Sequence, residues 1–211
     1  MKTSLILSAT LAVRSAITKQ RDDIDALDSA LAGANHYAQL KRTVEEIASQ
    51  YNTLILMRED QVFNQIGNQL SANLNDYSGL LLSNFFYGME KFTHNHVIHN
   101  TQDIAKMLSF GVQTAMQRSK IKIGGKTLLD VLVPVSTTLT TMAGQGKSNT
   151  EICYALKDAA DKGLEYTRDL QATQGQATSL GNRSIGHLDA RAKSCQVIIH
   201  AICDLLLKQQ S

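Results

Sequence analysis

The chain has 211 residues, of which 43% are hydrophobic and 19% are charged, and its formal net charge is +2. This balance argues against a nucleic-acid-binding surface and an acidic tail, so we expect no direct nucleic-acid partner. The length allows one domain with a substantial core, and a single proline is typical of a chain made mostly of helices.

The N-terminal segment MKTSLILSATLAV joins a basic start to a short apolar run, a pattern that a secretory signal peptide shares. Arg14 follows at once, however, and Leu5, Ala9, Ala12 and Ala16 continue at helical spacing. We therefore expect an amphipathic first helix and a cytoplasmic protein. Three cysteines without a CxxC motif suit a reducing compartment, and no apolar run approaches the length of a membrane span.

Hydrophobic residues recur at helical spacing along nearly the whole chain, without strand-like alternation. Ser148 and Glu151 form a capping box, and Asn100 precedes a second helix start. Pro134 lies inside an apolar helical stretch and is expected to kink it. The sequence therefore predicts one all-α domain over residues 1–211. Its helices are expected at about 3–20, 21–32, 36–51, 58–75, 78–94, 101–118, 127–144, 149–173 and 192–209.

Polar segments interrupt these helices at 31–39, 74–80, 119–127 and 179–194. The last of them, SLGNRSIGHLDARAKS, carries two glycines, a histidine, an aspartate and two arginines between two helical stretches. Loops of this kind at one end of a helical bundle can converge on a ligand.

The GGKT segment at 124–127 resembles part of a phosphate-binding P-loop, but that motif requires another glycine five residues before Gly125 and a preceding strand. Position 120 is lysine and a helix precedes the segment, so we interpret it as a glycine turn before a helix. The helix start at Thr127 still offers backbone N–H groups to an anion.

Two clusters suggest metal binding but have simpler interpretations. His94, His96 and His99 could bind a metal, although no carboxylate or cysteine lies near them in sequence, which favours a solvated loop. Asp25 and Asp28, one helical turn apart in an acidic run, could share a cation, but a solvated helix face is the more frequent explanation.

The segments IGGKTLLDVLVPV (123–135) and GQATSLGNRSIGHLDA (175–190) resemble the two signature loops of the nucleotide-binding L subunit (DhaL) of dihydroxyacetone kinase. That family's forms are approximately PGDKTMxDVxxP and GRASYLGERSIGHxDPGA, and LGNRSIGH matches at seven of eight positions. The order and spacing of the motifs extend the resemblance over essentially the whole chain. It implies a closed barrel of eight antiparallel amphipathic helices, with ADP and magnesium held by loops at one end.

The metal loop departs from the family pattern LDxxxGDxDHG. The corresponding LDSALAGANHY keeps Asp28, whereas Gly33 and Asn35 replace the second and third aspartates. His36 is retained, and Tyr37 replaces the closing glycine. The resemblance thus assigns Asp28 and Asn35 to the metal, with two carboxylates missing.

The loops expected at the nucleotide also differ. Where the family has the phosphate loop GGASGP, this chain has NDYSGL, so Asp76 replaces a glycine and Tyr77 an alanine. Gln176 replaces an arginine, and DARA (189–192) replaces DPGA. By resemblance, the cofactor-binding residues are His36, Tyr37, Ser78, Gly79, Arg118, Thr127, Leu128, Gln176, Asp189, Ala190 and Arg191.

The chain has lost residues expected at the metal and the nucleotide but keeps the signature segments of the family. This favours a non-catalytic relative with weak or no Mg–ADP binding, and we assign it no catalytic residue. In the family, ADP receives phosphate from a phosphohistidine protein and passes it to dihydroxyacetone on the K subunit. The resemblance therefore implies a K-like subunit, a phosphohistidine donor protein or a transcriptional regulator as partner, and no membrane.

Two alternatives remain open, so the sequence does not decide whether the chain is an enzyme. An active phosphotransferase subunit would need a compensating carboxylate from Asp22, Asp25 or Asp76. A metal-free anion or nucleotide sensor would use Arg118 and Lys126 with the helix start described above.

Overall fold

The computed structural model describes residues 2–33 and 35–209, and this part of the chain is helical without strands. Two of its elements are short 3₁₀ helices, named η1 and η2. The elements are α1 (Thr3–Lys19), α2 (Arg21–Ala30), α3 (His36–Ser49), α4 (Tyr51–Leu54), α5 (Glu59–Asn73), α6 (Tyr77–Asn95), α7 (Thr101–Ser119), α8 (Leu129–Gly144), α9 (Asn149–Tyr166), η1 (Thr167–Asp169), η2 (Gln176–Ser184) and α10 (Ala190–Lys208).

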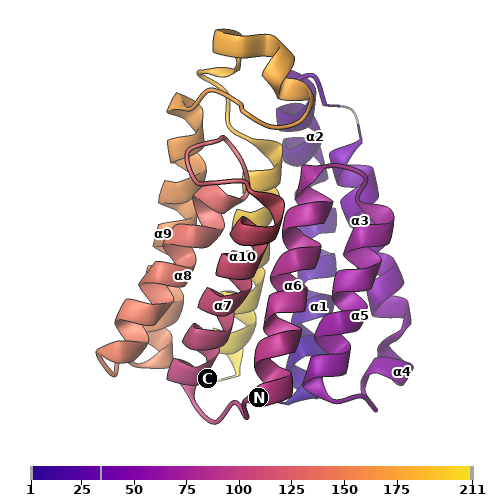
Figure 1. The fold of residues 1–211 in the computed structure, drawn as a ribbon, viewed down its shortest axis with the longest axis vertical. Coiled ribbons are helices and arrows are strands. Elements are labelled where there is room, and N and C mark those ends of the chain that lie inside the picture. The colour runs from indigo at the N-terminus through magenta and orange to yellow at the C-terminus, as the bar shows by residue number, and fades with distance from the viewer. Residues whose placement is uncertain (1, 34, 210–211) are drawn as a thin grey trace.

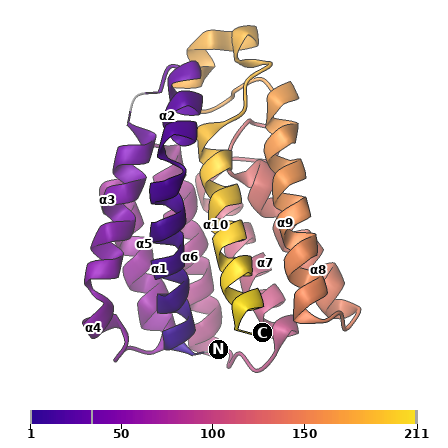
Figure 2. The same cartoon turned by 180° about the vertical axis from the view of Figure 1, so that it is seen from behind.

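Eight of the described helices form a closed ring in the order α1, α3, α5, α6, α7, α8, α9, α10, with α10 packing back onto α1. Neighbouring helices in the ring run antiparallel (Figures 1 and 2). Helix α2 prolongs α1 after a break at Gln20, and α4 is a single turn outside the wall. The predicted eight-helix antiparallel barrel is therefore confirmed.

The connections at the two ends of the barrel differ in character. Helix α1 starts and α10 finishes at one end, which also carries the connections 50–58, 96–100 and 145–148 (Figure 1). The opposite end, here called the loop end, carries the connections 31–35, 74–76, 120–128 and 167–189. The four polar segments singled out in the sequence therefore meet at one end of the barrel, as predicted.

The wall is held by apolar side chains that point inward, including the fully buried Leu7, Leu81 and Val131. Helices α6 and α7 approach closely at Gly88 and Gly111, where a Cβ added to Gly88 would lie 2.8 Å from the Cα of Gly111. The cysteines at 153, 195 and 203 are buried and free, as expected of small apolar residues.

Several predicted boundaries were wrong because local capping competes with hydrophobic periodicity. The helix predicted to reach residue 173 ends at Tyr166 and continues as η1. Residues 179–184 of the predicted loop 179–194 belong to the 3₁₀ helix η2. Helix α10 begins at Ala190, because the Asp189 side chain accepts the N–H of Ala192 at 2.8 Å. Helix α3 ends at Ser49, before 51.

The two predicted helix starts are confirmed. The Ser148–Glu151 capping box is present, and Asn100 caps α7. Pro134 lies inside α8. Because proline has no N–H, the carbonyl of Asp130 lacks its helical hydrogen bond, and Gly163 of α9 packs against this carbonyl. No helix in the described ranges is long and apolar enough to cross a membrane.

Candidate functional site at the loop end

A cavity of about 500 Å³ opens at the loop end of the barrel, and we call it the loop-end cavity. Its walls come from the start of α3, the loop before α6, the segment before η2 and the first turn of α10. The lining residues are Asn35, His36, Gln39, Asn75, Asp76, Tyr77, Gly175, Gln176 and Arg191. Of the residues assigned by resemblance, Asn35, His36, Gln176 and Arg191 meet here.

Asp76 is the N-cap of α6, and its carboxylate satisfies the free donors of that helix start. Oδ1 accepts the N–H of Ser78 at 2.9 Å, the hydroxyl of Ser78 at 2.5 Å and the N–H of Gly79 at 3.4 Å. Helix N-termini favour negative charge, and here the chain supplies it. Burial alone would raise the pKa of Asp76, but the Ser78 hydrogen bond and the charge of Arg191 outweigh burial and lower it.

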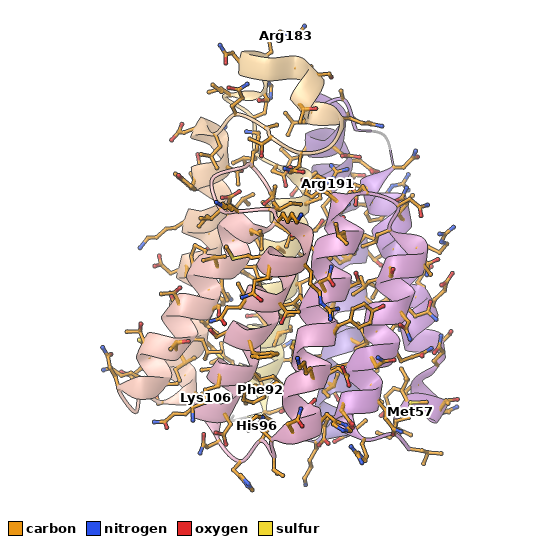
Figure 3. The ribbon with its side chains drawn as sticks, in the orientation of Figure 1. Met57, Phe92, His96, Lys106, Arg183 and Arg191 are labelled. Carbon is orange, nitrogen blue, oxygen red and sulfur yellow. The ribbon has the colours of Figure 1, made fainter. Side chains whose placement is uncertain are left out.

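Arg191, in the first turn of α10, lines the cavity and joins two carboxylates. Figure 3 labels it near the loop end. Its Nη1 lies 2.6 Å from Oδ1 of Asp28, while Nε and Nη2 lie 3.0 and 2.9 Å from Oδ2 of Asp76. The guanidinium also lies 5.7 Å from the centre of the Tyr77 ring. Burial alone would lower the pKa of Arg191, but the acidic groups around it raise that pKa, so the side chain stays charged.

Asp28 lies at the end of α2 and is almost fully buried. Its Oδ2 accepts the backbone N–H of His36 at 3.0 Å, so the carboxylate ties the end of α2 to the start of α3. The same carboxylate rests against Gly33, where an added Cβ would overlap it. Asp28 therefore fills the space in which a side chain at position 33 would begin.

His36 is a buried neutral imidazole. The hydroxyl of Ser194 donates to the carbonyl of Ala190 at 3.0 Å, so it accepts from Nε2 of His36 at 2.9 Å. Burial, and then the charge of Arg191, lowers the pKa of His36 to about 4. The retained histidine thus cross-links α3 to α10 without adding positive charge to the cavity.

The remaining walls are built from aromatic and amide side chains. The Tyr77 ring packs against Gly175, whose positive φ of 65° turns the chain into η2. Burial raises the pKa of Tyr77 well above its usual value, so its hydroxyl stays protonated. Tyr37 does not line the cavity; it is buried below it, with Arg21 lying 5.8 Å from its ring centre.

The GGKT turn serves the scaffold. Lys126 is 1% exposed, and its Nζ donates to the carbonyls of Thr167 at 2.5 Å, Leu170 at 3.2 Å and His187. The Thr127 N–H donates to Oδ2 of Asp130 at 2.7 Å. These groups are engaged within the protein, which argues against the anion site that the sequence suggested around Lys126 and Thr127.

Other residues assigned by resemblance lie behind the cavity wall. Leu128 and Ala190 are buried. Burial raises the pKa of Asp189, the cap of α10, to about 6. Arg118 of α7 lies 3.5 Å from the side-chain oxygen of Asn84. Ser78 and Gly79 contribute through the N–H groups that Asp76 already occupies.

The cavity does not fit a resident magnesium ion. Magnesium requires oxygen ligands in near-octahedral geometry, with anionic charge to balance it. Both oxygens of Asp28 and both of Asp76 already have partners, and Arg191 stands between the two carboxylates. Asp25 pairs with Arg21 at 3.5 Å instead of reaching the cavity. Over the described ranges, no group of three histidine, cysteine or acidic residues could hold a metal.

The histidines of the HNHVIH segment lie at the opposite end of the barrel, where Figure 3 labels His96 beside Phe92. His94 Nδ1 lies 3.0 Å from Asp60, and His96 stacks on Phe92 with ring centres 4.5 Å apart. His94 lies in the last turn of α6 instead of the predicted loop, whereas His96 and His99 follow that helix, and all three are exposed.

Comparison with known proteins shows the family of the chain. The family model for the DAK2 domain matches residues 30–204. The chain belongs to the DAK2 domain family. The matched range runs from the end of α2 into α10 and includes the LGNRSIGH segment in η2 and the following turn.

Curated relatives of this DAK2 domain match over most of their length. The ADP-binding subunit DhaL of a PEP-dependent dihydroxyacetone kinase of Listeria innocua is 29% identical over 83% of each chain. The corresponding subunit of Escherichia coli is 26% identical over 83% of this chain and 84% of its own. That of Lactococcus lactis is 23% identical over 90% and 91%.

Crystal structures of the dihydroxyacetone kinase of C. freundii share the fold. The native form matches 96% of this DAK2 domain with a TM-score of 0.73 at 20% identity. The complex with AMP-PNP and Mg²⁺ matches with a TM-score of 0.70. The chain spans 34% of the length of those enzymes.

Sequence reasoning missed three residues of the site in this DAK2 domain. Gln39 lines the cavity, Gly175 packs on Tyr77, and Ser194 holds His36. Gln39 and Ser194 follow His36 and Arg191 by one helical turn, a spacing that places them on the same faces. The pairing of Asp76 with Arg191 was also missed.

Proposed function

We propose that this DhaL-type DAK2 domain is a non-catalytic regulatory or scaffolding partner in a dihydroxyacetone-kinase-type system, and that it does not carry Mg–ADP. The observation that carries the proposal is the Arg191 guanidinium lying between Asp28 and Asp76. Phosphoryl transfer depends on positioning and on charge stabilisation of the phosphates. A site whose carboxylates are paired with an internal cation can neither position a magnesium-bound nucleotide nor stabilise the charge of its phosphates.

The frame of the domain supports a docking role. Arg183 and Ile185 of the retained RSIGH segment are exposed at the loop end, and Ile185 is 45% exposed although it is large and apolar. We propose a K-like subunit as the partner, with a phosphohistidine donor protein or a transcriptional regulator as further possibilities. A cytoplasmic location and a single domain over 1–211 belong to the same proposal.

Reconstitution tests this function directly. The K subunit and phosphodonor that work with the Escherichia coli relative are mixed with this chain in place of that relative, and phosphoryl transfer to dihydroxyacetone is measured. We expect no turnover, and we expect added chain to inhibit the complete Escherichia coli system in a dose-dependent way. Ile185→Asp should weaken that inhibition, whereas Tyr154→Asp, at an exposed residue in the middle of α9, should not. Turnover supported by this chain overturns the proposal.

A metal-free ligand sensor is a second candidate, and the loop-end cavity itself favours it. Four amide side chains, from Asn35, Gln39, Asn75 and Gln176, line the cavity and offer donors and acceptors without charge. The test is thermal stability with millimolar ADP or phosphate in the absence of magnesium, because a ligand that binds the folded state raises the melting temperature. An unchanged melting temperature removes this candidate.

A further inference from the structure

Two carboxylates from distant parts of the chain converge on one small volume at the loop end. Asp28 ends α2 and Asp76 begins α6, yet both lie within hydrogen-bond distance of a single guanidinium. The nitrogens that contact them belong to one rigid planar group, so the two nearest carboxylate oxygens lie on different sides of a single guanidinium. A small divalent ion that keeps several of its water ligands is bound in this way, through one or two carboxylates.

The other oxygens of these carboxylates are fixed by the backbone. Oδ2 of Asp28 is held by the N–H of His36, and Oδ1 of Asp76 by the N–H groups of Ser78 and Gly79. These bonds do not depend on Arg191. They would keep both carboxylates aimed at the same point if the arginine side chain were absent.

Among the described residues, Arg191 is the cation that reaches these carboxylates. His36 is neutral, and Lys126 donates to three backbone carbonyls instead. A carboxylate buried as deeply as Asp28 requires a compensating positive charge. The fold therefore requires a positive charge beside the Asp28 carboxylate, and in this chain the side chain of Arg191 supplies it.

We propose that Arg191 is a built-in cation that excludes divalent ions from the loop-end cavity, and that its removal turns Asp28 and Asp76 into a divalent-cation site. The inference rests on the proposed function, in which the domain does not carry Mg–ADP, and it attributes the loss of the magnesium site to Arg191. It assigns to Arg191 a role in specificity: a resident positive charge repels an approaching cation and occupies the oxygens that would bind it.

Manganese(II) titration of the purified chain, followed by calorimetry and by thermal unfolding, tests the proposal. We expect Arg191→Ala to bind Mn²⁺ at least roughly 100-fold more tightly than the unmodified chain, since a unit charge a few ångströms away is removed. Its melting temperature should rise with millimolar Mn²⁺. Arg183→Ala, which removes an exposed arginine at the same end, should behave like the unmodified chain.

Two further variants decide where and why the ion binds. Arg191→Lys keeps a positive charge and should not gain Mn²⁺ binding, and adding Asp76→Asn to Arg191→Ala should abolish the gain. If Arg191→Ala does not fold, Arg191→Gln, which keeps a hydrogen-bonding side chain of similar length, replaces it.

The proposal is overturned if neither uncharged variant gains Mn²⁺ binding, or if Arg191→Lys gains as much. Tight Mn²⁺ binding by the unmodified chain would overturn both this inference and the proposed function. Failure of the variants alone leaves the proposed function standing.

Discussion

Arg191 and Asp28 are 163 residues apart in the chain, yet their side chains approach to 2.6 Å. The side chain of Asp28 is 3% exposed and that of Arg191 is 17% exposed, so water screens this pair much less than it screens a surface ion pair. The carboxylate that a DhaL-type subunit is expected to offer to magnesium is thereby neutralised from within the protein. Stability and ligand binding at the loop end should both depend on this contact.

Replacing Arg191 by alanine should destabilise the fold. It leaves Asp28 buried without its counter-charge, and breaking a buried pair by removing one partner costs about 3 kcal/mol or more. Urea unfolding at pH 7 in the absence of divalent ions measures the change. Lys162→Ala is the matched control, because it removes a pair with Asp158 that is exposed on both sides and is expected to cost less than about 1 kcal/mol. Equal losses in the two variants would show that the Arg191 pair is no stronger than a surface pair.

His36 should make stability depend on pH between about 6.5 and 4. Because burial lowers its pKa in the folded state to about 4, the unfolded chain takes up a proton there that the folded chain does not. The contribution of His36 to the free energy of unfolding is therefore constant above the pKa that His36 has in the unfolded chain. It is lost as the pH falls through this window, by about 3 kcal/mol in total.

The free energy of unfolding of the unmodified chain minus that of His36→Gln isolates this effect. The raised pKa of Asp189 acts in the opposite direction over nearly the same range, but it is present in both proteins and cancels in the difference. A difference that stays flat from pH 7.5 to pH 4 would mean that His36 takes up its proton normally.

Lys126 should contribute to the stability of the fold and not to ligand binding. Lys126→Met keeps an apolar stem but leaves the carbonyls of Thr167, Leu170 and His187 without their shared donor, which we expect to cost about 3 kcal/mol. Thermal or urea unfolding reports the loss. Lys122→Met, at an exposed position in the same loop, should change stability by less than about 0.5 kcal/mol. A small loss at Lys126 together with weakened anion binding would instead favour a ligand-binding role.

Gly33→Ala should also destabilise the chain, by about 1–3 kcal/mol, because its Cβ would displace the Asp28 carboxylate from Arg191 and from the His36 N–H. Urea unfolding provides the measurement, with Gly144→Ala as a control at which the added Cβ meets nothing. In the Arg191→Ala background the cost of Gly33→Ala should shrink, since Asp28 is then less constrained. Strict additivity of the two changes would contradict the contact between them.

Local patterns in the sequence were sufficient for an all-α domain and for the polar loops at one end, whereas the closed barrel was predicted from the family resemblance. Hydrophobic periodicity placed the helices, and Ser148 and Asn100 marked two of their starts. The polar interruptions then indicated which end carries the loops. The family resemblance brought His36 and Arg191 into one site, and the cavity contains both.

The pairing inside the cavity was not accessible to the same reasoning. Asp76 and Arg191 are 115 residues apart, and neither helical spacing nor capping relates them. Asp76 alone indicates an N-cap, and Arg191 alone indicates a charge near a helix start. Only the closure of the ring, which brings α6 and α10 to the same end, makes them partners.

Calorimetric titration of the purified chain with ADP, with and without magnesium, tests most directly whether Arg191 has taken the place of the metal. We predict that magnesium adds nothing to any binding of ADP, because the carboxylates that would hold the ion are already paired with the arginine. Tight binding that requires magnesium would contradict this, and would mean that Asp28 and Asp76 leave Arg191 to coordinate the ion.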